Sequence, residues 1–277
     1  MALPEPTPVD DAADAPAVEL TPQPDGEARM SLIEHLTELR TRLIRALIAL
    51  FVGFLIAYAI ADPLFRLLTE PLREASQGKA LLIGTGVGEA FFTKLKVALV
   101  AGLFIASPAV FYEIWKFIVP GLYETERKMV LPFVISATIF FLAGGYFCWA
   151  VVFKLGYRFF LQQYASIEVT PTIRISEYLA FSAKLLLAFG ITFEMPIFAY
   201  FLTRLGMIDH KLMQQYFRYA VLVIFIVSAA LTPPDMVSMI LLAIPLVGLY
   251  GFSIAVSWAF RIKPAAVDTT AAPSPSA

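Results

Sequence analysis

Six long apolar segments alternate with polar segments along the chain. They span residues 45–61, 97–117, 129–153, 182–203, 219–231 and 236–260. A helix needs about 20 apolar residues to cross the hydrocarbon core of a bilayer, and most of these segments approach that length. The runs are continuous and show no period-two alternation, so they predict helices rather than the strands of a membrane barrel. The pattern therefore predicts an all-α integral membrane protein with six transmembrane helices.

The fifth apolar segment, residues 219–231, is shorter than the others, at 13 residues. At about 1.5 Å per residue it rises roughly 20 Å, whereas a bilayer core is about 30 Å thick. One interpretation is an ordinary helix that draws in flanking residues such as Met213 and Phe217. The other is local thinning of the bilayer around this helix. The sequence leaves both interpretations open.

The composition supports the membrane assignment and divides the chain into three parts. Hydrophobic residues make up 59% of the sequence and charged residues 16%, whereas soluble domains are nearer half apolar and a quarter charged. Residues 1–29 hold seven acidic residues, one basic residue and six prolines, which predicts a disordered tail. Residues 30–263 form the membrane domain, with 20 basic and 14 acidic residues. Residues 264–277 are expected to be a second disordered tail.

The distribution of basic residues predicts which side of the membrane each loop faces. They are concentrated in the shorter segments on one side, close to the span ends: Arg40, Arg42, Arg45, Lys116, Arg127, Lys128, Arg204, Lys211, Arg218, Arg261 and Lys263. Short basic loops mark the cytoplasmic side, and an even number of spans returns the chain to the side where it started. Both termini are therefore predicted to be cytoplasmic. Residues 62–96 and 154–181 are predicted to face outward and to form short cap helices.

Residues 31–47 predict an amphipathic helix that runs into the first span. One apolar stripe contains Leu32, Leu36, Leu39, Leu43 and Leu47. Glu38 and Arg42 lie on another face, four residues apart, where helical side chains pair. We expect this helix to lie on the cytoplasmic surface. Taken alone, its simplest interpretation is an interfacial anchor.

A carboxyl group interrupts the fourth apolar segment. Glu194 lies in the middle of this segment, and Pro196 follows two residues later. An ionisable side chain at this depth is costly unless it faces a cavity or a partner. Glu194 is therefore predicted to have a functional role.

The sequence predicts no cofactor, no metal site, no enzymatic activity and no nucleic-acid partner. Residues 84–92, "GTGVGEAFF", are rich in glycine, but Glu89 occupies the last glycine position of a dinucleotide-binding motif. Cys148 is the single cysteine, and its apolar surroundings favour a packing role. His35 and His210 are far apart and have no neighbouring metal-ligand types.

Several short motifs follow one another in a characteristic order. They are "HLTELRTRL", "EAFFTKLK", "SPAVFYEIWKFIVPGLYETERK", "FGITFEMP", "LTPPD" and "LLAIPL". With them, residues 31–262 resemble the TatC family, the large subunit of the twin-arginine protein translocase. The resemblance implies a cup-like bundle of six helices with both termini in the cytoplasm. It also implies a role in exporting folded proteins with the proton gradient, together with single-span TatA and TatB type subunits in a larger oligomeric complex.

The resemblance also implies a site for twin-arginine signal peptides on the cytoplasmic face. Residues 121–128, "GLYETERK", carry two carboxylates in a loop expected to be basic. Guanidinium groups pair with carboxylates in bidentate geometry, which gives Glu126 a purpose, whereas Glu124 stands where the family pattern is variable. Matched to the family pattern, the residues implied in the site are Glu38, Arg40, Phe117, Leu122, Glu126 and Arg127.

The contact with the single-span subunits is expected on the sixth helix. This chain has Met239 where the family often has glutamine, and Gly251 where the family commonly has glutamate. Thr232 remains as a candidate polar group at this contact. The polar part of the contact is therefore expected to be reduced.

Two other functions fit parts of the sequence. A secondary transporter for a small solute would use Glu194 and the proline-interrupted helices at Pro108 and Pro245. The sequence shows no inverted internal repeat in support of it. A receptor or scaffold that gathers partners without transporting anything is the other alternative.

Overall fold

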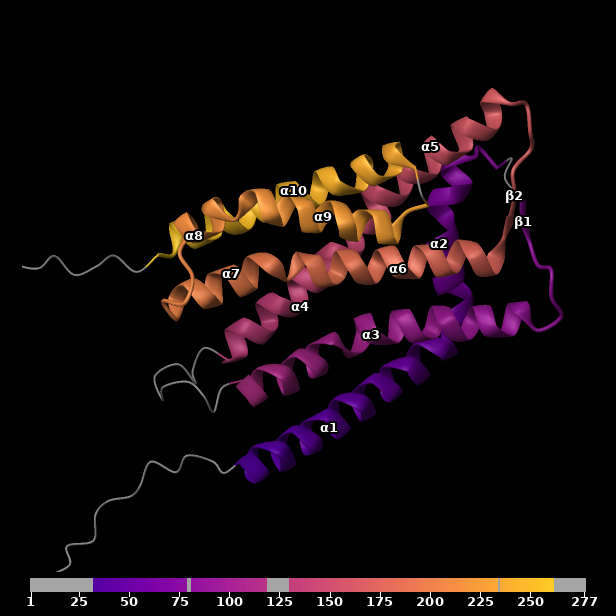
Figure 1. The fold of residues 1–277 in the computed structure, drawn as a ribbon. Helices are drawn as coiled ribbons and strands as arrows, with labels where there is room; N and C mark the ends of the chain where they lie inside the picture. Colours follow the sequence, from indigo (N-terminus) through magenta and orange to yellow (C-terminus); the bar gives the residue numbers. More distant parts are fainter. Residues whose placement is uncertain (1–31, 79–80, 119–129, 234, 262–277) are drawn as a thin grey trace, which may run out of the picture.

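The computed structural model describes residues 32–78, 81–118, 130–233 and 235–261, and over these residues the chain is almost entirely helical (Figure 1). The helices are α1 (Leu32–Ala59), α2 (Ala61–Ala75), α3 (Glu89–Ile118), α4 (Val130–Phe147), α5 (Phe153–Ser166), α6 (Ile175–Phe193), α7 (Met195–Arg204), α8 (His210–Gln215), α9 (Phe217–Leu231) and α10 (Met236–Ala259). A π-helical turn at Cys148–Val152 joins α4 to α5. Two strands, β1 (Leu81–Ile83) and β2 (Thr172–Arg174), complete the described elements.

Within the described residues, five helical segments are long and apolar enough to cross a membrane. They are Leu36–Ala59, Glu89–Phe117, Leu131–Ser166, Ile175–Arg204 and Met236–Ala259. Five of the six predicted spans are thus confirmed as long apolar helices. The fifth predicted span forms α9, an apolar helix of 15 residues, which is shorter than the others. The count of six spans and their orientation stay predictions.

The long helices lie side by side, and the bundle has two distinct ends (Figure 1). At one end, here called the proximal end, α1 begins, α3 ends, α4 begins and α10 ends. At the other, the distal end, lie α2, β1 and β2. The first and last described residues of the chain thus lie at the same end, as an even number of crossings requires.

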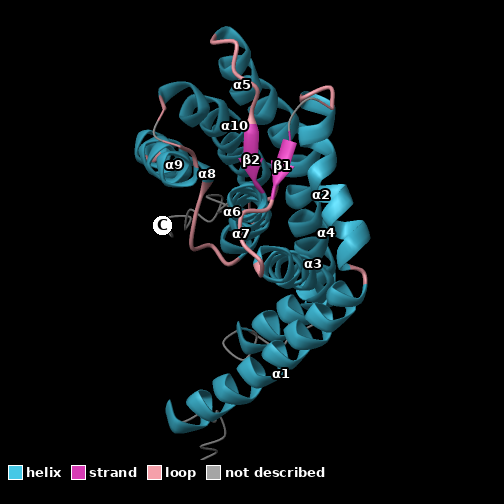
Figure 2. Ribbon diagram, turned by 90° about the vertical axis from the view of Figure 1, so that its right-hand side faces the viewer, coloured by secondary structure: helices cyan, strands magenta, loops and turns pink. Residues whose placement is uncertain are grey.

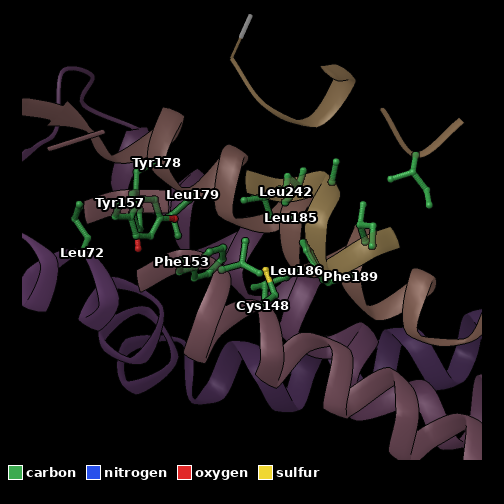
Figure 3. Close-up of a cluster of buried hydrophobic side chains, with 14 of the residues drawn as sticks. Leu72, Cys148, Phe153, Tyr157, Tyr178, Leu179, Leu185, Leu186, Phe189 and Leu242 are labelled. Atoms are coloured by element: carbon green, nitrogen blue, oxygen red, sulfur yellow. The ribbon is translucent and has the colours of Figure 1, made fainter. Parts of the chain in front are cut away.

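A cluster of buried side chains joins α5, α6 and α10 to α2 and α3. Figure 3 shows Cys148 in one buried cluster with Phe153, Leu185, Phe189 and Leu242, all of them nearly inaccessible. The predicted packing role of Cys148 agrees with this position. Burial of these apolar surfaces and the close packing of the side chains hold the helices together.

Buried hydroxyl groups tie the distal half of this cluster together. The hydroxyls of Tyr157 and Ser182 lie 2.7 Å apart, and the Tyr178 hydroxyl donates to the Leu68 carbonyl at 2.6 Å. A buried hydroxyl without a partner is costly, so these bonds fix α2, α5 and α6 relative to one another.

The distal end differs from its prediction. β1 and β2 pair in parallel, with Leu81 opposite Thr172 (Figure 2), and the sequence analysis predicted no strand. Among the described residues of the predicted cap regions, 62–96 and 154–181, α2 is the one separate short helix. The helix α5 continues α4 through the π-helical turn, and α3 and α6 begin at Glu89 and Ile175, earlier than predicted.

Glu89 fastens the distal segments together. Its Oε1 accepts from the Ser176 backbone N–H at 3.0 Å, and its Oε2 accepts from the Gly86 backbone N–H at 3.1 Å. A carboxylate at the start of α3 also suits the positive end of the helix dipole. One side chain thus joins the start of α3 to the start of α6.

The helix α1 stands at the edge of the bundle beside α3 (Figure 2). It is one continuous helix, so the predicted surface helix and the first span are a single element. Arg42 on its polar face contacts Glu113 of α3, whereas Leu36 and Leu43 are 62% and 57% exposed. Glycine lets α1 and α3 approach closely, because a Cβ on Gly102 would stand 2.7 Å from the Phe54 nitrogen.

Candidate functional site

An ion pair within α1 forms the first half of the candidate site. Arg42 Nε donates to Glu38 Oε1 at 3.0 Å, and Arg42 Nη2 donates to the same oxygen. The predicted pairing of Glu38 with Arg42 is thereby confirmed. One turn of helix separates the two residues, so the fork of the guanidinium reaches back along the helix face.

The helix α3 contributes the second half. Arg42 Nη1 lies 3.6 Å from Glu113 Oε2, which links α1 to α3 near the proximal end. The side chains of Arg42, Glu38 and Glu113 are 12%, 19% and 13% exposed. We call these three residues the Glu38–Arg42–Glu113 cluster.

The cluster is neither neutral nor fully hydrogen-bonded. Two carboxylates share one guanidinium, so its formal charge is negative. Glu38 Oε2, Glu113 Oε2 and Arg42 Nη1 are all buried and form no hydrogen bond with the described residues. Buried polar atoms without partners cost free energy, and unpaired buried charge costs more. The arrangement is therefore suited to receive a further cation with several N–H donors.

Glu113 is a site residue that the sequence analysis missed. It lies inside the second predicted span, residues 97–117, which was interpreted only as an apolar helix. The signal was the same as for Glu194, a carboxylate within an apolar segment. Phe117, four residues after Glu113, lies on the same side of α3 and is half-buried.

The other residues predicted for this site divide into two groups. Arg40 is exposed on α1, and two residues along a helix place it on a different face from Glu38. The structure thus brings Arg42, rather than Arg40, to Glu38. Leu122, Glu126 and Arg127 lie outside the described residues. Their segment begins directly after Ile118, at the end of α3.

Glu194 marks a break in the fourth predicted span. The helix α6 ends at Phe193 and α7 begins at Met195, with Pro196 in the first turn of α7. Proline removes a backbone donor and favours a helix start. The Glu194 side chain is buried, at 5% exposure, and its Oε1 has no hydrogen-bond partner among the described residues.

The residues predicted for the subunit contact lie at the distal end. Thr232 follows α9, and its hydroxyl donates to the Ser228 carbonyl at 2.8 Å. Met239 lies half-buried in the first turn of α10. This position is at the opposite end of the bundle from the Glu38–Arg42–Glu113 cluster (Figure 1).

Comparison with known proteins identifies the family. A family model described as Sec-independent protein translocase protein (TatC) matches residues 34–245, more than half of the chain. The chain belongs to the TatC family. The resemblance drawn from the sequence motifs is thereby confirmed.

Individual TatC proteins cover most of the chain. The Sec-independent protein translocase protein TatC of Desulforapulum autotrophicum is 44% identical over 82% of this chain and 84% of its own length. The TatC protein of Magnetococcus marinus is 40% identical over 83% of this chain and 84% of its own length. A crystal structure described as the twin arginine translocase receptor TatC, in DDM, superposes with a TM-score of 0.75 at 36% identity. It covers 81% of this chain and 99% of the solved chain.

Membership in the TatC family defines the broad function. The protein is a membrane component of twin-arginine protein transport, and thus a transport protein rather than a classical enzyme. The alternative of a secondary transporter for a small solute does not agree with this family. Within the described residues, no group of three or more histidine, cysteine, aspartate or glutamate side chains could hold a metal ion.

Proposed function

We propose that this TatC protein is the receptor subunit that binds twin-arginine signal peptides at its cytoplasmic face. It spans the inner membrane six times, with both termini in the cytoplasm. With single-span TatA and TatB type subunits it exports folded proteins, using the proton motive force. Several copies act together as a homo-oligomer within the larger complex.

The observation that carries this proposal is the unbalanced negative charge of the Glu38–Arg42–Glu113 cluster. A twin-arginine signal presents two adjacent guanidinium groups, each with N–H donors in a planar fork. Glu38 Oε2 and Glu113 Oε2 are carboxylate oxygens that form no hydrogen bond with described residues. The cluster also lies near the end of α3, next to the start of the segment that contains Glu126. These features support a shared anionic site at the proximal end.

The other proposed site residues have complementary roles. Glu126 supplies a carboxylate for the second arginine of the signal. Phe117 and Leu122 shape the apolar wall beside the charged groups. Arg40 and Arg127 place positive charge around the site. This charge orients the approaching signal peptide and repels any second basic segment of it.

The subunit contact is proposed on α9 and the start of α10. Leu222, Val223 and Ile226 of α9 are 58%, 56% and 60% exposed. A single-span helix would cover such an apolar face in the bilayer by close packing. Thr232 and Met239 lie at the distal end of the same region.

Glu38→Gln and Glu126→Gln test the proposed signal site, because each removes one charge and keeps the side-chain size. A charge-assisted hydrogen bond is worth roughly 1.5–3 kcal/mol, so each variant should bind a twin-arginine precursor about ten- to a hundred-fold more weakly. Binding is measured with purified protein in nanodiscs. Glu70→Gln, an exposed change on α2, is the matched control.

The same variants should also lose the preference for an Arg-Arg precursor over a Lys-Lys precursor. If the Glu38→Gln and Glu126→Gln double variant binds both precursors as the unaltered protein does, these carboxylates do not form the site.

A further inference from the structure

Arg42 already occupies the place that a signal arginine would take beside Glu38. Its Nε and Nη2 donate to Glu38 Oε1, and its Nη1 points to Glu113 Oε2. A planar guanidinium between two carboxylates is the arrangement expected for bound arginine. The protein thus places its own guanidinium in the proposed site.

The two sides of this arrangement are unequal. The contact with Glu38 is a hydrogen bond of 3.0 Å. The contact with Glu113 is 3.6 Å long, beyond the roughly 3.2 Å limit of a good N–H···O bond. Arg42 Nη1, Glu38 Oε2 and Glu113 Oε2 therefore remain without hydrogen bonds. A second guanidinium with better geometry toward both carboxylates would form the hydrogen bonds that Arg42 leaves unmade.

Departure of Arg42 would leave α1 attached to α3. Gly53, where a Cβ would stand 2.5 Å from the Gly102 carbonyl oxygen of α3, lies 11 residues beyond Arg42 along α1. At about 1.5 Å per residue this separation is roughly 16 Å. The glycine contact therefore holds the two helices together independently of the cluster.

We propose that Arg42 is an internal competitor for the arginine of the ligand, and that Glu113 is a further binding residue. The incoming guanidinium replaces Arg42 between Glu38 and Glu113. The identity of the ligand rests on the proposed function, whereas the competition is a property of these three residues and can be tested without a peptide.

The exchange also selects arginine over lysine. Breaking the contacts of Arg42 with Glu38 and Glu113 is offset only if the incoming group donates N–H bonds to both carboxylates. Lysine is a compact point charge without this fork. Arg42 thus lowers the apparent affinity of the site for any cation that pairs less well with the two carboxylates.

The first test uses guanidinium ion alone. In Arg42→Ala, millimolar guanidinium chloride should raise the thermal unfolding temperature relative to tetramethylammonium chloride at equal ionic strength, because the ion pairs with the two carboxylates. The unaltered protein and the exposed α1 variant Arg45→Ala should show no such rise. The rise should disappear in Arg42→Ala combined with Glu113→Gln. An equal response of Arg42→Ala and Arg45→Ala would overturn the proposal.

The second test uses a twin-arginine signal peptide. Glu113→Gln should weaken binding about tenfold, and Arg42→Gln should strengthen it about tenfold, as expected for one charge-assisted interaction. Arg45→Gln should leave binding unchanged. Weaker binding by folded Arg42→Gln would make Arg42 a positioning residue, and the competitor proposal would be wrong.

A double variant keeps this test valid if Arg42→Gln does not fold. Arg42→Gln combined with Glu113→Gln removes one charge of each sign, and it should bind the peptide more tightly than Glu113→Gln alone. Equal or weaker binding contradicts the proposal.

The two proposals fail in different ways. If Glu38→Gln leaves peptide binding unchanged while guanidinium stabilises Arg42→Ala, the competition stands and the signal site lies elsewhere. If Glu38→Gln weakens binding while Arg42 and Glu113 variants change nothing, the signal site stands and the competition is wrong.

Discussion

Gly53 of α1 lies so close to Gly102 of α3 that a Cβ on Gly53 would stand 2.5 Å from the Gly102 carbonyl oxygen. That distance is too short for any side chain, so the two helices can meet here only because both positions are glycine. The neighbouring Ala57 and Ala98 are fully buried. Close backbone approach through small residues is a common basis of helix association in membranes.

Gly53→Ala should therefore destabilise the protein by forcing α1 away from α3. Overpacking typically costs about 1–3 kcal/mol. Gly248→Ala on α10 is the matched control, since nothing lies within 4 Å of its added methyl group. Alanine is also the better helix former, so the control should be neutral or stabilising. Thermal unfolding in detergent compares the two variants, and equal unfolding temperatures would show that the glycine contact is unimportant.

Tyr178→Phe should weaken the junction between α2 and α6. It removes the hydroxyl that donates to the Leu68 carbonyl at 2.6 Å, in a part-buried contact between α6 and α2. The expected loss of stability is about 0.5–1.5 kcal/mol, the net value of one hydrogen bond. Tyr146→Phe serves as the control because Tyr146 is 68% exposed. Denaturation of both variants under one set of conditions gives the difference, and equal losses would contradict a special role for Tyr178.

The ion pair of Asp62 with Lys94 should make the corner between α1 and α2 sensitive to acid. The Lys94 ammonium, 2.7 Å away, donates a hydrogen bond and holds the pKa of Asp62 below its usual value of 3.8. Because the folded-state pKa is lowered, this pair adds stability above about pH 3.8. That stability is lost as the pH falls through the lowered pKa.

A carboxyl titration followed by NMR checks this expectation. Lys94→Gln should raise the pKa of Asp62 toward its usual value. The difference in stability between the unaltered protein and Asp62→Asn should vanish in strong acid. An Asp62 pKa that stays the same in Lys94→Gln would show that Lys94 is not the cause.

Cysteines on the exposed face of α9 should crosslink to a TatA or TatB type subunit. Leu222, Val223 and Ile226 face away from the bundle, whereas Ile224 and Ser228 are 8% and 0% exposed. Crosslinking should follow this difference, with strong products at the first three positions and weak ones at the last two. Equal yields at all five positions, or none on α9, would place the subunit elsewhere.

The length of the apolar segments predicted the long helices well, because each helix forms its backbone hydrogen bonds within one continuous segment. The strand pair β1 and β2 could not be predicted, since three residues per strand give no measurable period. The continuity of α4 and α5 was also missed. In the sequence, the charge of Lys154 indicates the end of a span. In the structure, Lys154 remains within the continuous helix, and its ammonium pairs with Glu74 of α2 at 2.7 Å.

The candidate site was predicted in part. Glu38 and its pairing with Arg42 could be predicted from helical spacing, which is a local property. The approach of Glu113 could not, because it depends on how α1 crosses α3 at Gly53 and Gly102. Contacts between elements far apart in the sequence require the crossing geometry, which single residues do not reveal.

The pairing of Glu38 with Arg42 has a consequence for biosynthesis, because both residues belong to the same helix. During translation α1 emerges well before α3, and Gly102 follows Gly53 by 49 residues. The pair neutralises itself within α1, so the helix can enter the bilayer before any partner exists. Only when α3 arrives does Glu113 add its negative charge. The nascent chain therefore acquires the charge imbalance of its site at the step in which two helices assemble.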